Sequence, residues 1–451
     1  MRFRSRRVLL PQGESAACLD VHEGRITSIE PWDAPGEVTH ELGEHVLMPG
    51  VVDTHVHCNE PGRTEWEGFR TATRAAAAGG VTTLVDMPLN SIPATTTAAA
   101  VRAKTDAMAG QLHVDVGLWG GVIPGNAGDL EELLRSGVLG CKCFLSPSGV
   151  DEFPHVHEAD LMGVVDALSR SQAPLLVHAE DPDKLLAMPV STRRHSDWLA
   201  SRPPAAEASA IRMLGRLARH ANVRVHIVHV ASRAALDAID EARRAGASMS
   251  GETCPHYLTF AAEEIPDGAT EYKCAPPIRG HEERSALRRA VIEGRLDLVA
   301  SDHSPAPPAL KRQGTGDFAL SWGGIASLEL SLPATWTALQ EEGASLSCLA
   351  RSMSEMPARL ARLERTKGSL TVGHDADLVV FDPDAKFVVD SMQLHQRHPI
   401  TPYAGRTLRG RVRGTWLRGH AVYDGSRLLG EPRGHWLRNE WQVLSRPGGV
   451  A

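Results

Sequence analysis

The sequence predicts an α/β fold in which a closed (β/α)8 TIM barrel carries a small β-sandwich built from both chain ends. Between about residues 46 and 301, short apolar strands alternate with helical segments about eight times, and this order favours a parallel sheet with right-handed crossovers. The two ends carry short strand patterns instead, and neither end has enough strands for a core of its own. We therefore expect the ends to share one sandwich that the barrel splits in sequence.

The predicted elements set the domain boundaries. Residues 1–48 form the first part of the sandwich, residues 49–363 the barrel, and residues 364–451 the second part of the sandwich and a tail. After the first barrel strand, which ends near residue 57, we expect barrel strands at residues 81–86, 114–122, 139–145, 175–178, 223–230, 248–254 and 296–301. The expected helices are residues 97–108, 129–135, 159–170, 206–220, 233–245 and 285–293. The sandwich strands are residues 17–21, 25–29, 368–373, 376–381, 412–417 and 421–423.

Composition narrows the functional classes. The chain has 451 residues, a net charge of -7 and 42% hydrophobic residues, which suits one large catalytic domain with a smaller one. The mild acidity and the missing basic stripe argue against a nucleic-acid partner, and no apolar run has the length of a membrane span. The seven cysteines are scattered and contain no C-x-x-C pair. We therefore expect reduced thiols and a cytoplasmic location.

The first sign of chemistry is a pair of histidines after a buried strand. His55 and His57 follow the apolar run at residues 46–52, which indicates a strand buried on both faces, as in a parallel sheet. Because side chains alternate along a strand, the two imidazoles point the same way and can bind one metal ion. For such a pair alone, two core histidines or an exposed strand end would be the better explanation. The metal-site interpretation therefore needs further ligands elsewhere in the chain.

Further candidate ligands stand at the ends of later strands, where barrel enzymes place their catalytic residues. His178 ends the strand at residues 175–178, and Asp302 follows the last strand. His229 lies nearer the end of its strand than His226, which faces the opposite side, so His229 is the candidate ligand and His226 a packing or supporting residue. Lys142 lies between two cysteines that face the other way.

This set of side chains predicts two metal ions. Four histidines and a carboxylate exceed the three protein ligands of a typical mononuclear catalytic zinc, and they suit two ions about 3.5–4 Å apart. A lysine ammonium has no lone pair, but a neutral Lys142 amine that reacts with CO2 gives a carbamate able to bridge both ions. The alternatives are a surface lysine on a misplaced strand, and core histidines at positions 178 and 229. The candidate ligands occur together at successive strand ends, which argues against these alternatives.

The chain is similar over nearly its whole length to the cyclic amidohydrolases of the amidohydrolase superfamily. Residues 49–57 match the opening motif of that superfamily. Within it, the chain most closely resembles the allantoinase family. The segments that carry this resemblance are residues 60–68, 87–95, 142–151, 252–257, 273–279, 301–305, 322–326 and 402–406.

The resemblance implies metal-dependent hydrolysis of the cyclic amide bond of (S)-allantoin to allantoate, in purine catabolism. It implies that His55, His57 and Asp302 bind one metal ion and that His178 and His229 bind the other. Lys142 would be an N6-carboxylysine that bridges the two ions. Asp302 would also act as general base and acid toward a bridging hydroxide. The implied cofactors are two divalent ions per subunit, with Zn2+ expected and Co2+, Mn2+ or Fe2+ as alternatives, and CO2 for lysine carboxylation. A homotetramer is usual among relatives.

The resemblance also suggests substrate contacts from backbone groups and from small polar side chains. The candidates are Asn90, Ser146, Ser148, Ala275, Ser304 and Gly323. Asn90 could instead serve as a turn residue, and Ser304 as a helix cap. The pair Ala179-Glu180 differs from related sequences, and we expect it not to touch a metal ligand.

One difference from dihydroorotase-like sequences concerns the substrate. Those sequences follow H-x-H with an arginine two residues later, which neutralises a carboxylate on the ring; here Cys58 and Asn59 follow instead. We therefore expect no cation for a charged substituent, and a neutral ureido-hydantoin such as allantoin fits better. The nearest rival is a hydantoinase or dihydropyrimidinase. A non-catalytic scaffold on the same fold is a more distant rival, because such proteins typically lose ligands and all six positions are filled here.

Overall fold

The middle of the chain forms a closed barrel of parallel strands. In this computed structural model, which describes residues 1–439, the barrel strands pair in chain order, and β7 and β8 are two halves of one strand interrupted at Trp119. A parallel bridge between Val56 and His303 closes the circle, and the His57 amide donates to the His303 carbonyl at 2.8 Å. The strands are β5 (Val51–Val56), β6 (Val81–Asp86), β7 (Asp115–Leu118), β8 (Gly120–Gly121), β9 (Cys141–Phe144), β10 (Leu175–His178), β11 (Val225–Ile227), β12 (Met249–Thr253) and β13 (Leu298–Val299). The predicted barrel is confirmed.

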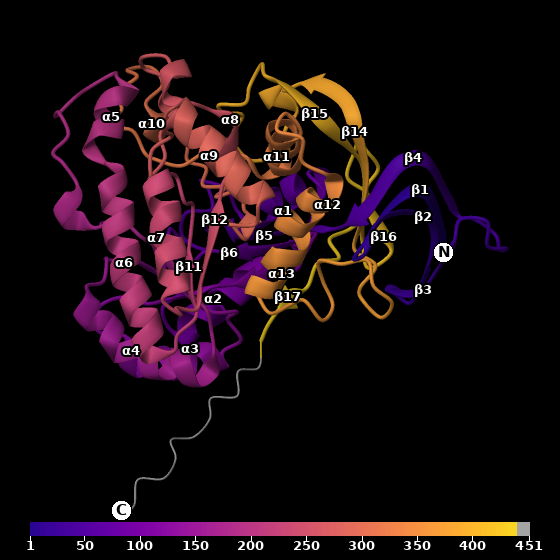
Figure 1. Ribbon diagram of the computed structural model, residues 1–451, viewed down its shortest axis with the longest axis horizontal. Helices are drawn as coiled ribbons and strands as arrows, with labels where there is room; N and C mark the ends of the chain where they lie inside the picture. Colours follow the sequence, from indigo (N-terminus) through magenta and orange to yellow (C-terminus); the bar gives the residue numbers. More distant parts are fainter. Residues whose placement is uncertain (440–451) are drawn as a thin grey trace, which may run out of the picture.

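Helices cover the outside of the barrel, and α7 shows how the sequence places them (Figure 1). Its buried residues include Leu236, Ile239 and Ala242, which recur every three positions on one face. The Ser232 hydroxyl caps the helix by accepting from the Ala235 amide at 3.2 Å. The helices are α1 (Phe69–Ala78), α2 (Ala98–Met108), α3 (Leu130–Arg135), α4 (Glu158–Ser171), α5 (His195–Ser201), α6 (Pro204–Ala221), α7 (Arg233–Arg244), α8 (Pro255–Thr259), α9 (His281–Ile292), α10 (Pro308–Lys311), α11 (Ser331–Gln340), α12 (Leu346–Ala350) and α13 (Met356–Leu360). Among these helices of residues 1–439, none combines the length and the apolar character needed to cross a bilayer.

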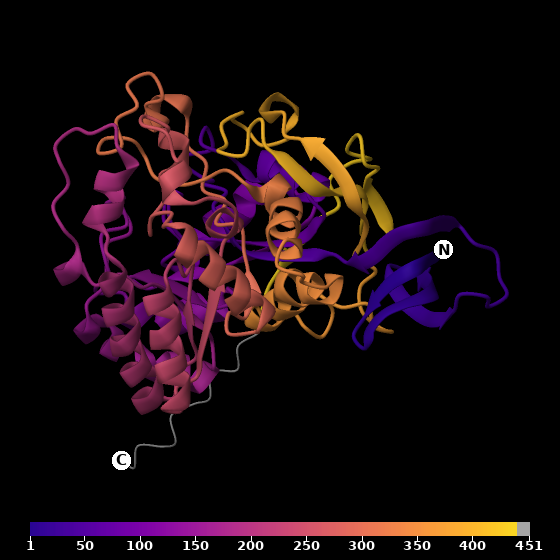
Figure 2. The same ribbon diagram turned by 45° about the horizontal axis from the view of Figure 1, so that its top comes forward.

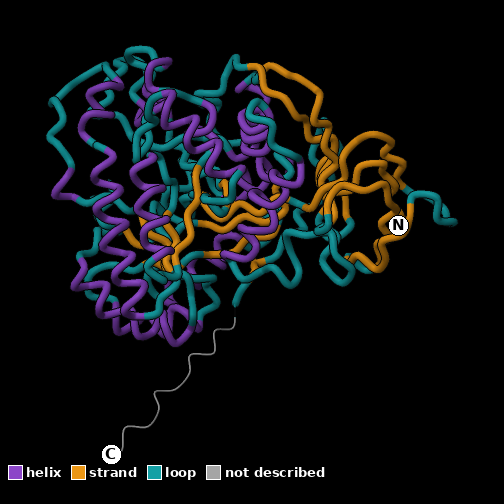
Figure 3. The backbone as a smooth tube through the Cα atoms, in the orientation of Figure 1, coloured by secondary structure: helices purple, strands orange, loops and turns teal. Residues whose placement is uncertain are grey.

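The two chain ends combine, as predicted, into one β domain beside the barrel. Its seven strands run in the order β16-β15-β14-β4-β1-β2-β3, and the antiparallel pair of β14 with β4 joins the two ends. Figure 2 shows the indigo N-terminal strands next to the yellow C-terminal ones, and Figure 3 shows them as a group apart from the barrel strands. A separate apolar core, which includes Phe3, Leu19 and Leu378, holds the domain together. The strands are β1 (Arg2–Leu10), β2 (Gly13–His22), β3 (Arg25–Pro31), β4 (His40–Pro49), β14 (Leu378–Val388), β15 (Thr407–Leu417) and β16 (His420–Tyr423).

A single glycine separates this β domain from the barrel strand that carries the first histidines. Gly50 lies between β4 and β5, and its amide donates to the Asp377 carbonyl at 2.8 Å. A Cβ at this position would lie 2.1 Å from the Thr82 hydroxyl oxygen. Only glycine therefore allows β5 to approach β6 closely at the base of the barrel.

Two segments near the C-terminus differ from the expected pattern. The predicted strand at residues 368–373 is a series of turns, because Gly368 and Gly373 both have positive φ, at 79° and 92°. The segment β17 (Trp436–Leu437) leaves the β domain and pairs with β7 of the barrel. The domain boundaries stay a prediction, and the last part of the predicted tail, residues 440–451, lies outside the described residues.

A buried cluster of charges ties the two domains together below the barrel. The Lys367 ammonium lies 2.6 Å from Asp115 of β7, 2.9 Å from Asp375 and 2.7 Å from Asp377. Arg418 of the β domain also pairs with Asp115. Because the Lys367 side chain is only 2% exposed, its charge is the main compensation for carboxylates that have little access to water.

We predict that Lys367→Ala lowers the free energy of unfolding by about 3–5 kcal/mol, because it leaves buried carboxylates without their partner. Urea unfolding followed by tryptophan fluorescence measures the change. Lys184→Ala, at an exposed position, is the control and should unfold like the wild type. An unchanged unfolding midpoint for Lys367→Ala would show that the cluster does not hold the domains together.

Candidate metal centre

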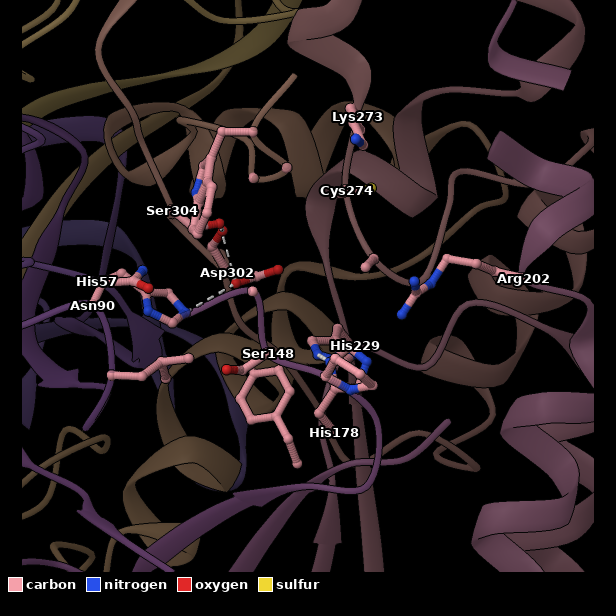
Figure 4. Close-up of a pocket in the computed structure, with 18 of the residues that line it drawn as sticks. His57, Asn90, Ser148, His178, Arg202, His229, Lys273, Cys274, Asp302 and Ser304 are labelled. Carbon is pink, nitrogen blue, oxygen red and sulfur yellow. Dashed lines mark hydrogen bonds and ion pairs between the residues drawn. The ribbon is translucent and has the colours of Figure 1, made fainter. Parts of the chain in front are cut away.

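The predicted ligands meet at the carboxyl-terminal end of the barrel (Figure 4). His55 lies in β5 and His178 ends β10, while His229 and Asp302 follow β11 and β13 by a few residues. His229 and Asp302 both have positive φ, at 42° and 45°. A positive φ is strained for a non-glycine residue. The backbone thus leaves the strand direction at the two positions where a ligand is needed.

One cluster contains two imidazoles and a carboxylate. Asp302 Oδ1 lies 3.2 Å from His55 Nε2 and 3.5 Å from His57 Nε2. Burial alone would raise the pKa of Asp302, but the adjacent His55 and His57 lower it below its usual range. The carboxylate is therefore ionised. Two nitrogens and one oxygen that converge in this way are the N/O donor set of a divalent transition-metal site.

A second cluster lies beside the first. His178 Nδ1 is 3.0 Å from His229 Nε2, and the His229 ring centroid is 5.5 Å from that of His55. Burial lowers the pKa of both His178 and His229, so their rings are neutral and their lone pairs are free to bind a metal. Within residues 1–439, His229 Nδ1 has no hydrogen-bond partner.

Lys142 is buried beneath these clusters. It is 1% exposed, and no hydrogen bond or ion pair joins its amine to any other side chain of residues 1–439. Its nearest aromatic contact is the face of Phe144, with 5.0 Å between Nζ and the ring centroid. Burial lowers the pKa of Lys142 to about 8, although the charges of Glu252 and Asp302 oppose that effect. A buried amine that is partly neutral near pH 8 has the form that reacts with CO2.

Two glutamates that the sequence analysis missed orient the ligands. Glu252 of β12 joins His55 Nδ1 at 2.5 Å to His226 Nε2 at 3.0 Å. His226 in turn meets the Ser250 hydroxyl at 2.8 Å. Such carboxylate–imidazole contacts fix the tautomer and the direction of a ligand ring. Reading the inward-facing positions of each strand, in addition to the strand ends, would have found Glu252.

The second glutamate corrects an expectation. Glu180 Oε2 lies 2.6 Å from His178 Nε2, so the pair Ala179-Glu180 does touch a candidate ligand. The reason is that residues 178 and 180 are two positions apart, and an extended chain places such side chains on the same side. Burial would raise the pKa of Glu180, but the charge of Arg202 and the bond to His178 lower it to about 2.

A cavity of about 270 Å³ opens above the clusters. Five of the predicted metal ligands line it, namely His55, His57, His178, His229 and Asp302. Five of the six predicted substrate contacts also line it, namely Asn90, Ser148, Ala275, Ser304 and Gly323. Neither Lys142 nor Ser146 is among the lining residues. The Ser146 hydroxyl is fully buried and has no hydrogen-bond partner within residues 1–439. Ser146 therefore lies next in sequence to the cavity-lining Pro147, but its own side chain does not line the cavity.

The cavity also contains cations that the sequence analysis did not anticipate. Position 59 supplies none, as expected, but Arg202 and Lys273 both line the cavity. Arg202 follows α5 and pairs with Glu180 at 2.7 Å. The Lys273 ammonium lies 4.5 Å from the Trp198 ring centroid and donates to the Ser321 carbonyl at 2.7 Å. Distant segments thus bring two cations to the cavity, although position 59 supplies none.

Comparison with known proteins agrees with this geometry. Residues 46–422 match the model described as the amidohydrolase family. The chain belongs to the amidohydrolase family. As an amidohydrolase it has a metal centre, and the side chains that converge above the barrel are candidates to hold it.

Several named proteins are similar to this amidohydrolase. The allantoinase of Streptomyces avermitilis is 50% identical over 424 residues, which covers 93% of this chain and 94% of the relative. The allantoinase of Arabidopsis thaliana is 43% identical over 441 residues, covering 93% of this chain and 87% of the relative. Among solved structures, the L-hydantoinase (dihydropyrimidinase) from Arthrobacter aurescens has a TM-score of 0.91 at 28% identity, and covers 97% of this chain and 99% of that one.

We predict that Glu252→Gln weakens metal binding about 10- to 100-fold, because His55 loses the carboxylate that fixes its ring. Competition with a chromophoric chelator measures the affinity. Glu263→Gln, whose side chain is 57% exposed, is the control. Wild-type affinity in Glu252→Gln would mean that His55 needs no orienting partner.

Proposed function

We propose that this amidohydrolase is an allantoinase that opens the five-membered ring of (S)-allantoin to give allantoate, in purine catabolism. The observation that carries the proposal is the 50% identity to the Streptomyces avermitilis allantoinase over 93% of this chain. The cavity supports it, since its volume of about 270 Å³ suits a small cyclic substrate.

The proposed metal centre holds two divalent ions. One is bound by His55, His57 and Asp302, whose donor atoms all lie within 4.8 Å of one another. The other is bound by His178 and His229, whose facing nitrogens are 3.0 Å apart. We propose that Lys142, as a carbamate formed with CO2, bridges the two ions. Zn2+ is the expected metal, and the N/O donors also suit Co2+, Mn2+ or Fe2+.

In the proposed mechanism, the protein's main task is to move one proton. Bound divalent ions supply Lewis acidity, which makes a water more acidic and polarises the amide carbonyl. Asp302 is ionised and lines the cavity, so it can take the proton from the attacking water. It then gives the proton to the ring nitrogen as the C–N bond breaks. Burial lowers the pKa of His178 and His229, so these imidazoles are poor acceptors for this proton.

The rival activity is hydantoin or dihydropyrimidine hydrolysis. It is favoured by the TM-score of 0.91 to the Arthrobacter aurescens enzyme, but that likeness comes with only 28% identity. The scaffold interpretation receives less support, because all six ligand positions hold metal-binding residue types. The higher identity to allantoinases decides our choice between the two hydrolases.

Three further features of the proposal concern the setting of the enzyme. We propose a cytoplasmic location, which is supported by seven free cysteines, six of them buried. The partner we expect is the small-molecule substrate, with neither nucleic acid nor membrane involved. A homotetramer stays a prediction that rests on the family resemblance.

Ring opening by the purified, metal-loaded protein tests the proposal. Racemic allantoin, hydantoin and dihydrouracil are compared in parallel, and product carboxylate is measured. We expect allantoin to be converted fastest, with conversion stopping near half of the racemate. Faster turnover of hydantoin or dihydrouracil would assign the protein to the rival activity. Absence of all three activities with two metals bound would support the scaffold interpretation instead.

A further inference from the structure

Arg202 enters the cavity from the side opposite the proposed general base. Figure 4 shows its guanidinium projecting toward the open centre, across from His57 and Asp302. The residue lies directly after α5, in a segment between β10 and α6 that has no part in the barrel repeat. Neither the metal assignment nor the proton transfer uses it.

Glu180 holds this guanidinium in one orientation. Arg202 Nε donates to Glu180 Oε1 at 3.0 Å, and Nη2 donates to Oε2 at 2.7 Å. The ring of Trp198 lies 5.0 Å from the guanidinium carbon and donates through Nε1 to the Cys274 carbonyl at 2.8 Å. The Arg202 side chain is 14% exposed. Such a two-pronged arginine–carboxylate contact is geometrically specific.

One arm of the guanidinium remains uncommitted. Within residues 1–439, Arg202 Nη1 has no hydrogen-bond acceptor, whereas Nε and Nη2 are both used. Lys273 differs, since its ammonium donates to the carbonyls of Ser321 at 2.7 Å and Ala319 at 3.4 Å. Of the two cations that line the cavity, Lys273 already uses two of its three N–H donors, whereas Arg202 has a whole NH2 group left for a ligand.

The charge of this donor is already balanced. Glu180 is fully buried, and its carboxylate meets the Arg202 guanidinium through two contacts, at 3.0 Å and 2.7 Å. The pair therefore presents N–H groups with little net charge. A donor of this kind suits a neutral oxygen acceptor, whereas an anionic substituent would meet the nearby Glu180 carboxylate without a spare positive charge.

We propose that Arg202 Nη1 binds the carbonyl oxygen of the ureido substituent, which makes Arg202 a specificity-determining residue. This inference rests on the proposed allantoinase function. It assigns the ureido substituent to the side of the cavity where Arg202 lies. Glu180 also bonds His178 at 2.6 Å. The same carboxylate therefore orients both the guanidinium and a candidate metal ligand. The scissile amide and the substituent are thereby held at a fixed separation.

The test compares two substrates in the same variant. Hydantoin has the ring of allantoin without the ureido group, so damage to the metal centre lowers both activities while loss of the Arg202 contact lowers only one. For Arg202→Gln we expect the ratio of kcat/KM for allantoin to that for hydantoin to fall about 10- to 100-fold, as for loss of a hydrogen bond to a charged group. Arg202→Lys keeps the charge beside Glu180 but loses the fork, and should also lower the ratio.

Arg194→Gln provides the matched control, since Arg194 adjoins the same helix and its side chain is 64% exposed. This variant should keep the wild-type ratio. An equal fall of both activities in Arg202→Gln and Arg202→Lys would overturn the proposal and leave Arg202 a structural role only.

A second measurement keeps the proposal testable if the wild type turns over hydantoin too slowly to follow. Acetohydroxamate chelates the metals and is too short to carry a ureido group, so its inhibition constant reports the metal centre alone. We expect Arg202→Gln to change that constant much less than kcat/KM for allantoin, and equal changes would contradict the inference. A wild-type enzyme that opens hydantoin but not allantoin would refute the proposed function itself.

Discussion

The exclusion of water from the end of the barrel is the constraint on which the rest of the site depends. His178, His229 and Lys142 are each at most 3% exposed, and burial lowers the pKa of all three. Burial opposes the ionisation of Asp302, but the adjacent His55 and His57 outweigh that effect and keep the carboxylate ionised. Burial thus prepares neutral nitrogens and a reactive amine, and the histidines beside Asp302 maintain a charged base in the same cavity.

The fold maintains this arrangement through contacts outside the donor set. Glu252 orients the His55 ring, and Glu180 orients the His178 ring. Glu180 also holds Arg202 at the cavity wall. Strained backbone at His229 and Asp302 turns their side chains inward directly after short strands. Backbone strain of this kind costs about 1–3 kcal/mol per residue and persists only where the surroundings enforce it. The closed barrel and its buried ion pairs supply that enforcement.

Features carried by local patterns could be predicted from the sequence. The period-two spacing of His55 and His57 and the apolar run before them identified the strand and its direction, and the repeat of strands and helices identified the barrel. Residues 368–373 were misread, because alternating polar and apolar residues between two glycines resemble a strand. Glu252 and Arg202 were missed for another reason: their partners depend on tertiary structure, and Glu252 reaches a ligand 197 positions away. Ser146 shows the same limit, since its sequence neighbourhood does not reveal which way it faces.

The central claim is that these residues hold two metal ions bridged by a modified Lys142. Crystallography of the zinc-loaded protein, with anomalous scattering recorded at the metal edge, tests it most directly. The account predicts two anomalous peaks about 3.5–4 Å apart, one beside His55, His57 and Asp302 and one beside His178 and His229, with carbamate density on Lys142 between them. A single peak, or an unmodified Lys142 beside two fully occupied ions, would contradict it.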